Sequence, residues 1–322
     1  MDYRSKHTTT VSSAMEGDII RGLDRMGRRR TKRRVRRTRR RKQWGGKPPA
    51  YVFRFGGNAG FGSVVNVMIH AIQYAKEQGR DFYLKDEIWN GGPLSRWHEA
   101  FKTLTTYDPE KHGHEKNDGA HPKYDGMRGY SLSELHGVVK DILVLNDDLA
   151  KKAKDFTESI GGPYTSIYVR RGDKVNGCAV APKEMEPMPA DELLKECEMK
   201  DDGRKLFIMS DDYTVVDELR KALPSCKIFT LTPDTNRGLA QDIVGKFTPE
   251  ERKKQSDELV TSMQVFLNGE KAYADNRSNL GRLLKVAKPD TVHLYPVTEH
   301  SKALKPETPI WPSWRELGKE LV

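Results

Sequence analysis

The chain of 322 residues is long enough for one large or two medium-sized domains, each with a hydrophobic core of its own. Its three cysteines form no closely spaced pair, no apolar run approaches the roughly 18 residues of a membrane span, and the start lacks the apolar stretch of a signal peptide. The net charge of +10 comes from one segment, because Arg28–Lys42 holds 12 of the 56 basic residues. The rest of the chain has 44 basic and 46 acidic residues and is therefore nearly neutral. These features exclude a disulfide-rich, membrane-spanning or uniformly basic protein.

Residues 1–50 have the composition of a disordered basic arm followed by a linker. Met1–Gly27 is polar, Arg28–Lys42 repels itself, and Trp44–Pro49 is rich in Gly and Pro. Such an arm binds RNA, DNA or an anionic surface without sequence preference, and it can also be a nuclear localisation signal. A merely solubilising tail fits the composition equally well.

The folded part begins with a strand, a glycine-rich turn and a helix. We expect a strand at Tyr51–Phe55, the turn at Gly56–Ser63, a helix at Val64–Gln78 and a second strand at Phe82–Leu84. Glycine-rich turns let the backbone approach a ligand and direct helix N–H groups toward negative charge. The glycine spacing matches no standard nucleotide-binding motif, so a plain tight turn remains the alternative.

The segment Asp86–Ser131 has no regular periodicity, and two of its residue types, tryptophan and histidine, suggest a role. Its tryptophans, Trp89 and Trp97, line an acceptor groove or pack in a core. Its three histidines suggest a metal site, but without cysteines or an i,i+4 histidine pair a solvated loop is the favoured interpretation. The histidines are His112, His114 and His121.

Strands and helices then alternate. Gly161–Pro163 breaks the chain, so we expect one domain at 51–160 and another at 161–322. The alternation predicts two parallel, doubly wound sheets of an α/β protein. The strands are expected at Ile142–Leu145, Thr165–Val169, Lys205–Met209, Cys226–Thr230, Lys271–Ala274 and Thr291–Leu294, and the helices at Leu132–Val139, Asn146–Ile160, Ala190–Glu198, Tyr213–Leu223, Pro249–Leu267 and Asn279–Ala287.

Two predicted strands end in charged residues. Thr165–Val169 is followed by Arg-Arg-Gly-Asp-Lys at 170–174, and Lys205–Met209 is followed by Ser-Asp-Asp at 210–212. In open α/β sheets, ligands bind outside the carboxyl ends of the strands. Because a guanidinium offers a planar fork of donors to phosphate oxygens, paired arginines at this edge favour a phosphate ligand. Solvated charges at a surface strand end are the alternative.

These motifs resemble the fucosyltransferase superfamily, which includes alpha-1,6- and alpha-1,2-fucosyltransferases and protein O-fucosyltransferases. Tyr168–Asp173 fits the first motif of the family, His-x-Arg-Arg-x-Asp, except that tyrosine replaces histidine. Ser210–Asp212 is similar to the Thr-Asp-Asp that ends the second motif, and Ser278 to the serine of the third motif. The proline-containing acidic stretch Glu184–Pro187 and the glycine-rich turn are further points of likeness, which together cover about residues 51–295.

The resemblance implies a GT-B fold of two Rossmann-like domains, with the nucleotide in the C-terminal half. It also implies an inverting transfer of fucose from GDP-fucose to a glycan or glycoprotein, without a metal ion or other cofactor. Preorganised cations such as Arg170 would then stabilise the charge that develops on the leaving diphosphate. The expected catalytic residues are Arg170, Lys174 and Glu186, and the expected nucleotide-binding residues are Gly57, Asn58, Gly60, Tyr168, Arg170, Arg171, Asp173, Ser210, Asp211, Asp212 and Ser278.

The sequence also departs from the family pattern. Tyr168 removes a cationic contact, and Cys178 stands where the alpha-1,6 enzymes have an acidic residue, so the general base is sought at Glu184 or Glu186. No aspartate matches the base-reading one of the third motif, and Asp257 fits poorly by spacing. Arg171 and Asp212 are each as well explained by bracing their loops.

Two further hypotheses stay open beside a glycosyltransferase. One is a nucleic-acid-associated protein that acts through its basic arm and binds a nucleotide without catalysis. The other is a non-catalytic interaction protein built on this fold. Since no membrane anchor is visible in the sequence, we expect a cytoplasmic protein, with a nuclear protein or a viral protein in the host cytoplasm as variants.

Overall fold

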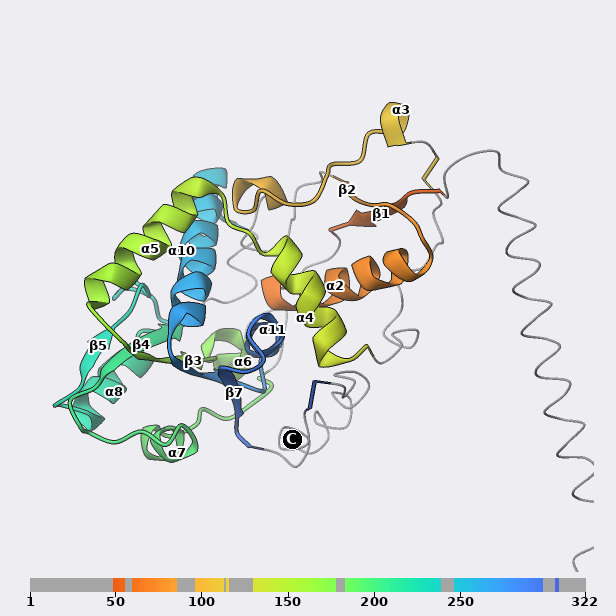
Figure 1. Ribbon diagram of the computed structural model, residues 1–322. Helices are drawn as coiled ribbons and strands as arrows, with labels where there is room; N and C mark the ends of the chain where they lie inside the picture. Colours follow the sequence, from red (N-terminus) through yellow and green to blue (C-terminus); the bar gives the residue numbers. More distant parts are fainter. Residues whose placement is uncertain are drawn as a thin grey trace, which may run out of the picture. The chain divides into compact units, whose positions relative to one another are not determined.

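The computed structural model describes residues 49–55, 60–85, 96–112, 114–115, 130–177, 183–238, 246–297 and 305–306. Strands and helices alternate along this part of the chain (Figure 1). The strands are β1 (Tyr51–Arg54), β2 (Phe82–Lys85), β3 (Thr165–Val169), β4 (Lys205–Ser210), β5 (Lys227–Phe229), β6 (Lys271–Asp275) and β7 (Val292–Tyr295). The helices are α2 (Phe61–Glu77), α3 (Pro109–His112), α4 (Leu132–Ile142), α5 (Asp147–Ile160), α6 (Gly172–Asn176), α7 (Ala190–Glu196), α8 (Thr214–Ala222), α10 (Pro249–Asn268) and α11 (Asn279–Ala287), with a 3₁₀ turn η1 at Trp97–Glu99.

A five-stranded parallel sheet organises the second half of the described chain. Its strand order is β5-β4-β3-β6-β7, and β3 pairs with both β4 and β6. The chain moves outward from β3 to β5, then crosses back through α10 to place β6 on the other side of β3. The order therefore reverses between β3 and β6, which is where open α/β sheets leave a crevice at their carboxyl ends.

Successive side chains of the central strand β3 pack against helices on opposite faces of the sheet. Ile167 and Val169 of β3 pack in a cluster with residues of α7 and α8. Tyr168 points to the opposite side and packs in the cluster that includes residues of α10 and α11. Because both faces are covered, the strand is apolar along most of its length rather than alternating between apolar and polar.

The first half contains a smaller parallel pair. β1 and β2 pair from Tyr51 opposite Phe82 to Arg54 opposite Lys85. Tyr51 stacks on Phe82 and meets Tyr74 of α2 edge to face, so α2 covers one face of this pair. Isolated parallel bridges extend it on both sides, from Leu84 to Thr106 and from Ala50 to Glu115.

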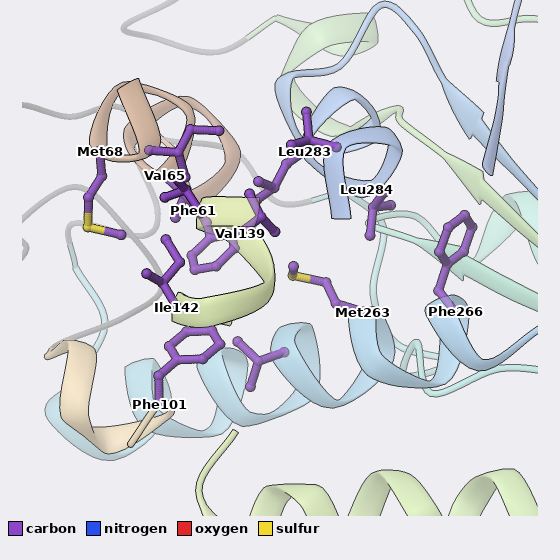
Figure 2. Close-up of a cluster of buried hydrophobic side chains, with 14 of the residues drawn as sticks. Phe61, Val65, Met68, Phe101, Val139, Ile142, Met263, Phe266, Leu283 and Leu284 are labelled. Carbon is purple, nitrogen blue, oxygen red and sulfur yellow. The ribbon is translucent and has the colours of Figure 1, made fainter. Parts of the chain in front are cut away.

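One hydrophobic cluster joins the two halves (Figure 2). Side chains of α2, α4, α10 and α11 converge in it, with Phe101 at its edge. Figure 2 labels Phe61, Val65, Met68, Phe101, Val139, Ile142, Met263, Phe266, Leu283 and Leu284. Burial of such side chains contributes roughly 1.5–3 kcal/mol each, so this cluster is a main source of stability for the arrangement of helices around the switch point. The domain boundary near residue 160 stays a prediction.

Most predicted elements are present, and the α/β fold class with parallel sheets is confirmed. The predicted strand Ile142–Leu145 is wrong, because α4 continues through Ile142 and Leu145 makes only an isolated bridge to Phe101. Trp97 is a core residue rather than a groove residue, since it is 2% exposed and stacks on Phe101. Among the described residues, no helix is both long and apolar enough to cross a membrane.

Candidate functional site

A pocket of about 360 Å³ opens at the carboxyl ends of β3 and β4, at the switch point of the large sheet. Its walls come from the ends of these strands, the first turns of α2 and α11, the loop after β5, and one face of α10. The lining residues are Gly60, Phe61, Gly62, Ser63, Tyr168, Arg170, Asp173, Lys174, Met209, Ser210, Asp211, Leu231, Thr232, Pro233, Asn236, Gln255, Glu258, Leu259, Ser262, Ser278, Asn279 and Leu280.

Arg170 is the central cation of this pocket. It follows the last residue of β3, and its two terminal nitrogens form ion pairs with Asp211 and Asp173. Burial lowers the pKa of Arg170, but the nearby carboxylates of Asp211 and Asp173 outweigh this effect and leave the pKa above its ordinary value. A guanidinium carries five N–H donors, so those not engaged by the two carboxylates remain for a ligand.

Arg171 points away from the pocket and fastens the loop to α8. Its guanidinium donates to both carboxylate oxygens of Glu218, at 2.8 and 2.6 Å. Its backbone N–H donates to the Asp211 carboxylate at 2.8 Å. The strand end is therefore held from two sides, which directs Arg170 into the pocket while Arg171 lies on the opposite face of the sheet.

Lys174 lies at the rim on α6, where an acidic segment contacts it. Its ammonium pairs with Glu184, and its carbonyl accepts hydrogen bonds from the backbone N–H groups of Glu184 and Met185 at 2.9 Å. Glu186, in contrast, is paired with Lys183 at 2.6 Å and has an 80% exposed side chain. Of the two candidate general bases, Glu184 is the one in contact with a residue of the pocket wall.

Tyr168 and Ser278 meet on the pocket wall. The phenol of Tyr168 lies 3.0 Å from the hydroxyl oxygen of Ser278, which caps α11 by accepting from the N–H of Leu280 at 3.2 Å. Burial raises the pKa of the Tyr168 phenol, which therefore stays protonated at neutral pH. The tyrosine that replaces the motif's histidine thus contributes a neutral hydrogen-bonding group.

The N-termini of α2 and α11 come together at the pocket. The Asn66 amide donates to the Asn279 carbonyl at 2.9 Å, and a Cβ on Gly62 would lie only 2.5 Å from the Leu280 nitrogen. Glycine at position 62 is therefore required for this close approach. Neither helix has an acidic residue in its first turn, so the partial positive charges of both helix ends face the pocket.

Helix α10 and the loop after β5 form further walls of the pocket. Glu258 of α10 lines it, and burial raises the pKa of this carboxyl. Gly238, with a φ of +95°, packs against Gly172 of α6 so closely that a Cβ would lie 2.8 Å from the Gly172 Cα. This backbone contact holds the loop beside the Arg170 loop.

The structure brings together most of the residues expected from the sequence. Three expected residues do not line the pocket: Arg171, Asp212 and Glu186. The Asp212 carboxylate instead accepts hydrogen bonds from the backbone N–H and the hydroxyl of Thr214, at 2.9 and 2.8 Å, in the first turn of α8. Eight expected residues do line it: Gly60, Tyr168, Arg170, Asp173, Lys174, Ser210, Asp211 and Ser278. Gly57, Asn58 and the basic segment Arg28–Lys42 lie outside the described residues.

Several lining residues have no sequence motif. Gln255, Glu258 and Ser262 share one face of α10, and their spacing of three and four residues is the only sequence signal that could have grouped them. Thr232 and Asn236 come from the loop after β5.

A metal site at the histidines is not found in the described part. Among the described residues, no cluster of three or more His, Cys, Asp or Glu side chains could hold a metal ion. His112 instead stacks on Tyr83, with ring centroids 4.0 Å apart, and accepts from the Asp108 backbone. His121 lies outside the described residues.

Taken chemically, the pocket combines cationic groups with carboxylates, since Arg170 is paired with Asp173 and Asp211 and Glu258 is a further acidic lining residue. Arg170, Lys174 and two helix N-termini suit a phosphate or diphosphate. Glu258 on α10 suits a group that offers hydrogen-bond donors. A nucleotide has both features.

Comparison with known proteins gives a fold relationship and no sequence relationship. No protein-family model matches the chain, and no curated protein matches it. Among solved structures, POFUT1 in complex with GDP-fucose has a TM-score of 0.50 at 12% identity, covering 79% of this chain and 99% of that one. POFUT1 in complex with GDP also has a TM-score of 0.50 at 12% identity, covering 78% and 99%.

A further solved structure, the fucosyltransferase NodZ from Bradyrhizobium, has a TM-score of 0.49 at 11% identity, covering 74% of this chain and 92% of that one. The likeness to POFUT1 shows that this chain has a fucosyltransferase-like, GT-B-like α/β fold. The predicted resemblance at the level of the fold is thereby confirmed.

Proposed function

We propose that this chain is a fucosyltransferase that binds GDP-fucose in the pocket around Arg170 and transfers the sugar to a glycan or glycoprotein hydroxyl. The observation that carries the proposal is the position of Arg170 at the carboxyl end of β3, held by two carboxylates and facing two helix N-termini. The fold likeness to POFUT1, which has been crystallised with GDP-fucose, supports the choice of donor.

The proposed reaction breaks the bond between the anomeric carbon of fucose and a diphosphate oxygen. The electron pair leaves with GDP, and negative charge grows on that oxygen. Free N–H groups of Arg170, the ammonium of Lys174 and the N-terminus of α11 stabilise this charge because they are already in place before the bond breaks. These groups can do the work that a divalent ion does elsewhere, so we propose transfer without a metal.

The acceptor hydroxyl loses its proton to a base as it attacks the sugar. Glu184 is better placed for this role than Glu186, because Glu184 contacts Lys174 on the pocket wall whereas Glu186 is turned to solvent. We therefore assign the proposed general base to Glu184.

Glu258 supports a guanine nucleotide over a uracil nucleotide. The Watson–Crick edge of guanine presents two adjacent donors, the N1–H and the exocyclic amine, which fit the two oxygens of one carboxylate. Uracil presents one N–H between two carbonyl oxygens, which a carboxylate repels. Leu231, Pro233 and Leu259 supply apolar surface for the base in the same pocket.

The test is turnover of sugar nucleotides by the full chain. We expect slow release of fucose from GDP-fucose to water, faster release with an acceptor, no turnover of UDP-sugars, and the same rate with excess EDTA. Glu184→Gln should lower the rate without weakening GDP binding, and Glu258→Gln should weaken GDP binding. Binding and turnover of UDP-sugars in preference to GDP-fucose, or no sugar-nucleotide binding at all, would overturn the proposal.

A further inference from the structure

The hydrogen bond between Tyr168 and Ser278 determines which groups the pocket can offer to a ligand. Both residues line the pocket, yet Tyr168 is 3% and Ser278 6% exposed. The Tyr168 backbone is fixed as well, because its carbonyl accepts from the phenol of Tyr295 at 2.6 Å. The phenol and the hydroxyl therefore meet in one defined geometry.

The two hydroxyls hold more protons than they use between them. Among the described residues, the phenol of Tyr168 has one hydrogen-bond partner, the Ser278 oxygen, and either hydroxyl can donate in this bond. The Ser278 oxygen also accepts from the Leu280 N–H. Each hydroxyl carries one proton and only one of the two protons lies between the oxygens, so the other is left to point at whatever occupies the pocket.

We propose that Tyr168 and Ser278 position each other so that the pair presents one hydroxyl proton, as a hydrogen-bond donor, to an anionic group of the ligand. An obligatory donor at this place selects an acceptor such as a phosphate oxygen and disfavours an N–H group. Arg170 and the N-terminus of α11 border the same part of the wall, so the hydroxyl joins an existing anion site. The inference rests on the proposed function, because the anion is taken to be the diphosphate of the sugar nucleotide.

Tyr168→Phe tests this role, because it keeps the ring and removes only the phenol. In calorimetric titrations, we expect the affinity for GDP to fall roughly tenfold while the affinity for guanosine stays unchanged. Tyr164→Phe is the matched control: Tyr164 is 5% exposed and donates to the Val265 carbonyl at 2.6 Å, and it is not part of the pocket wall. This control should bind GDP like the wild type.

A double-mutant cycle shows whether Tyr168 acts through Ser278. We expect Tyr168→Phe to cost no further GDP affinity once Ser278→Ala is present. Equal weakening of GDP and guanosine by Tyr168→Phe, unchanged GDP binding, or additive effects of the two substitutions would each overturn the positioning role.

Failure of the proposed function gives a different pattern. A wild type that binds UDP but not GDP would refute the guanine donor, and the same comparison with UDP and uridine would still test Tyr168. A wild type that binds neither diphosphate would refute the donor site and the anion-directed hydroxyl together.

Discussion

Replacing Gly62 by alanine tests whether the contact between α2 and α11 builds the pocket wall. The new Cβ would lie 2.5 Å from the Leu280 nitrogen, 2.7 Å from the Leu280 Cα and 2.8 Å from the Asn279 carbonyl carbon. Because Cβ atoms essentially never approach other atoms closer than 3.0 Å, and because these atoms are backbone, the two helices must separate by roughly half an ångström. Overpacking of this kind costs about 1–3 kcal/mol.

The opposite effect is expected at Gly137, which lies in the interior of α4 with no atom within 4 Å of an added Cβ. Gly137→Ala should stabilise the protein by up to about 1 kcal/mol, because alanine favours a helix over glycine. The two variants should therefore differ by about 2 kcal/mol or more, which corresponds to a difference in Tm of roughly 4–8 °C.

Thermal unfolding with and without GDP measures both consequences. Gly62→Ala should lower the Tm and also reduce the increase in Tm that GDP produces, whereas Gly137→Ala should raise the Tm and leave the increase intact. If Gly62→Ala is as stable as Gly137→Ala and responds equally to GDP, the close approach of α2 and α11 is not needed for the fold or the site.

Three further predictions concern other parts of the chain. Burial lowers the pKa of His70 from 6.5 to about 4, although the hydrogen bond to the Asn66 carbonyl opposes this shift. As the pH falls, His70 therefore becomes protonated in the unfolded chain before it does so in the folded chain. Acidification from pH 7 to pH 5 should then cost about 2 kcal/mol in urea unfolding, and His70→Phe should lack that part of the dependence. Asp212→Ala should lose about 1 kcal/mol from the start of α8 with unchanged GDP affinity, whereas a loss of affinity would show that Asp212 contacts the nucleotide. Deleting residues 1–48 should leave GDP binding intact and abolish salt-sensitive RNA binding; RNA binding by the shortened chain would contradict a role for the arm.

The elements around the site could be predicted because their local patterns agree with the fold. Thr165–Val169 and Asn279–Ala287 have the predicted bounds, since an apolar run ends at charged residues in the first and a serine cap begins the second. The error at Ile142–Leu145 arose because four apolar residues fit a strand as well as a helix end. Ile142, the first residue of this run, belongs to α4 and continues the spacing of its buried residues Leu135, Val138 and Val139.

The roles of neighbouring charged residues could not be predicted from the motifs. Arg170 and Arg171 are adjacent, yet one faces the pocket and the other Glu218, because successive side chains at a strand end point to opposite faces. Glu258 could not be predicted as a pocket residue either. It lies within the 20-residue helix α10, which reaches the pocket only because the chain crosses back over the sheet, and no local sequence pattern encodes that placement.

The central claim is that the fork of Arg170 binds the diphosphate of a guanine nucleotide. Arg170→Lys is the informative variant, because it keeps a cation between Asp173 and Asp211 while losing the planar fork, whereas alanine would leave both carboxylates unpaired. Calorimetric titration with GDP should show a 10- to 100-fold weaker Kd than for the wild type, roughly 1.5–3 kcal/mol, with guanosine affinity unchanged. Equal GDP affinity of the two proteins would contradict the claim.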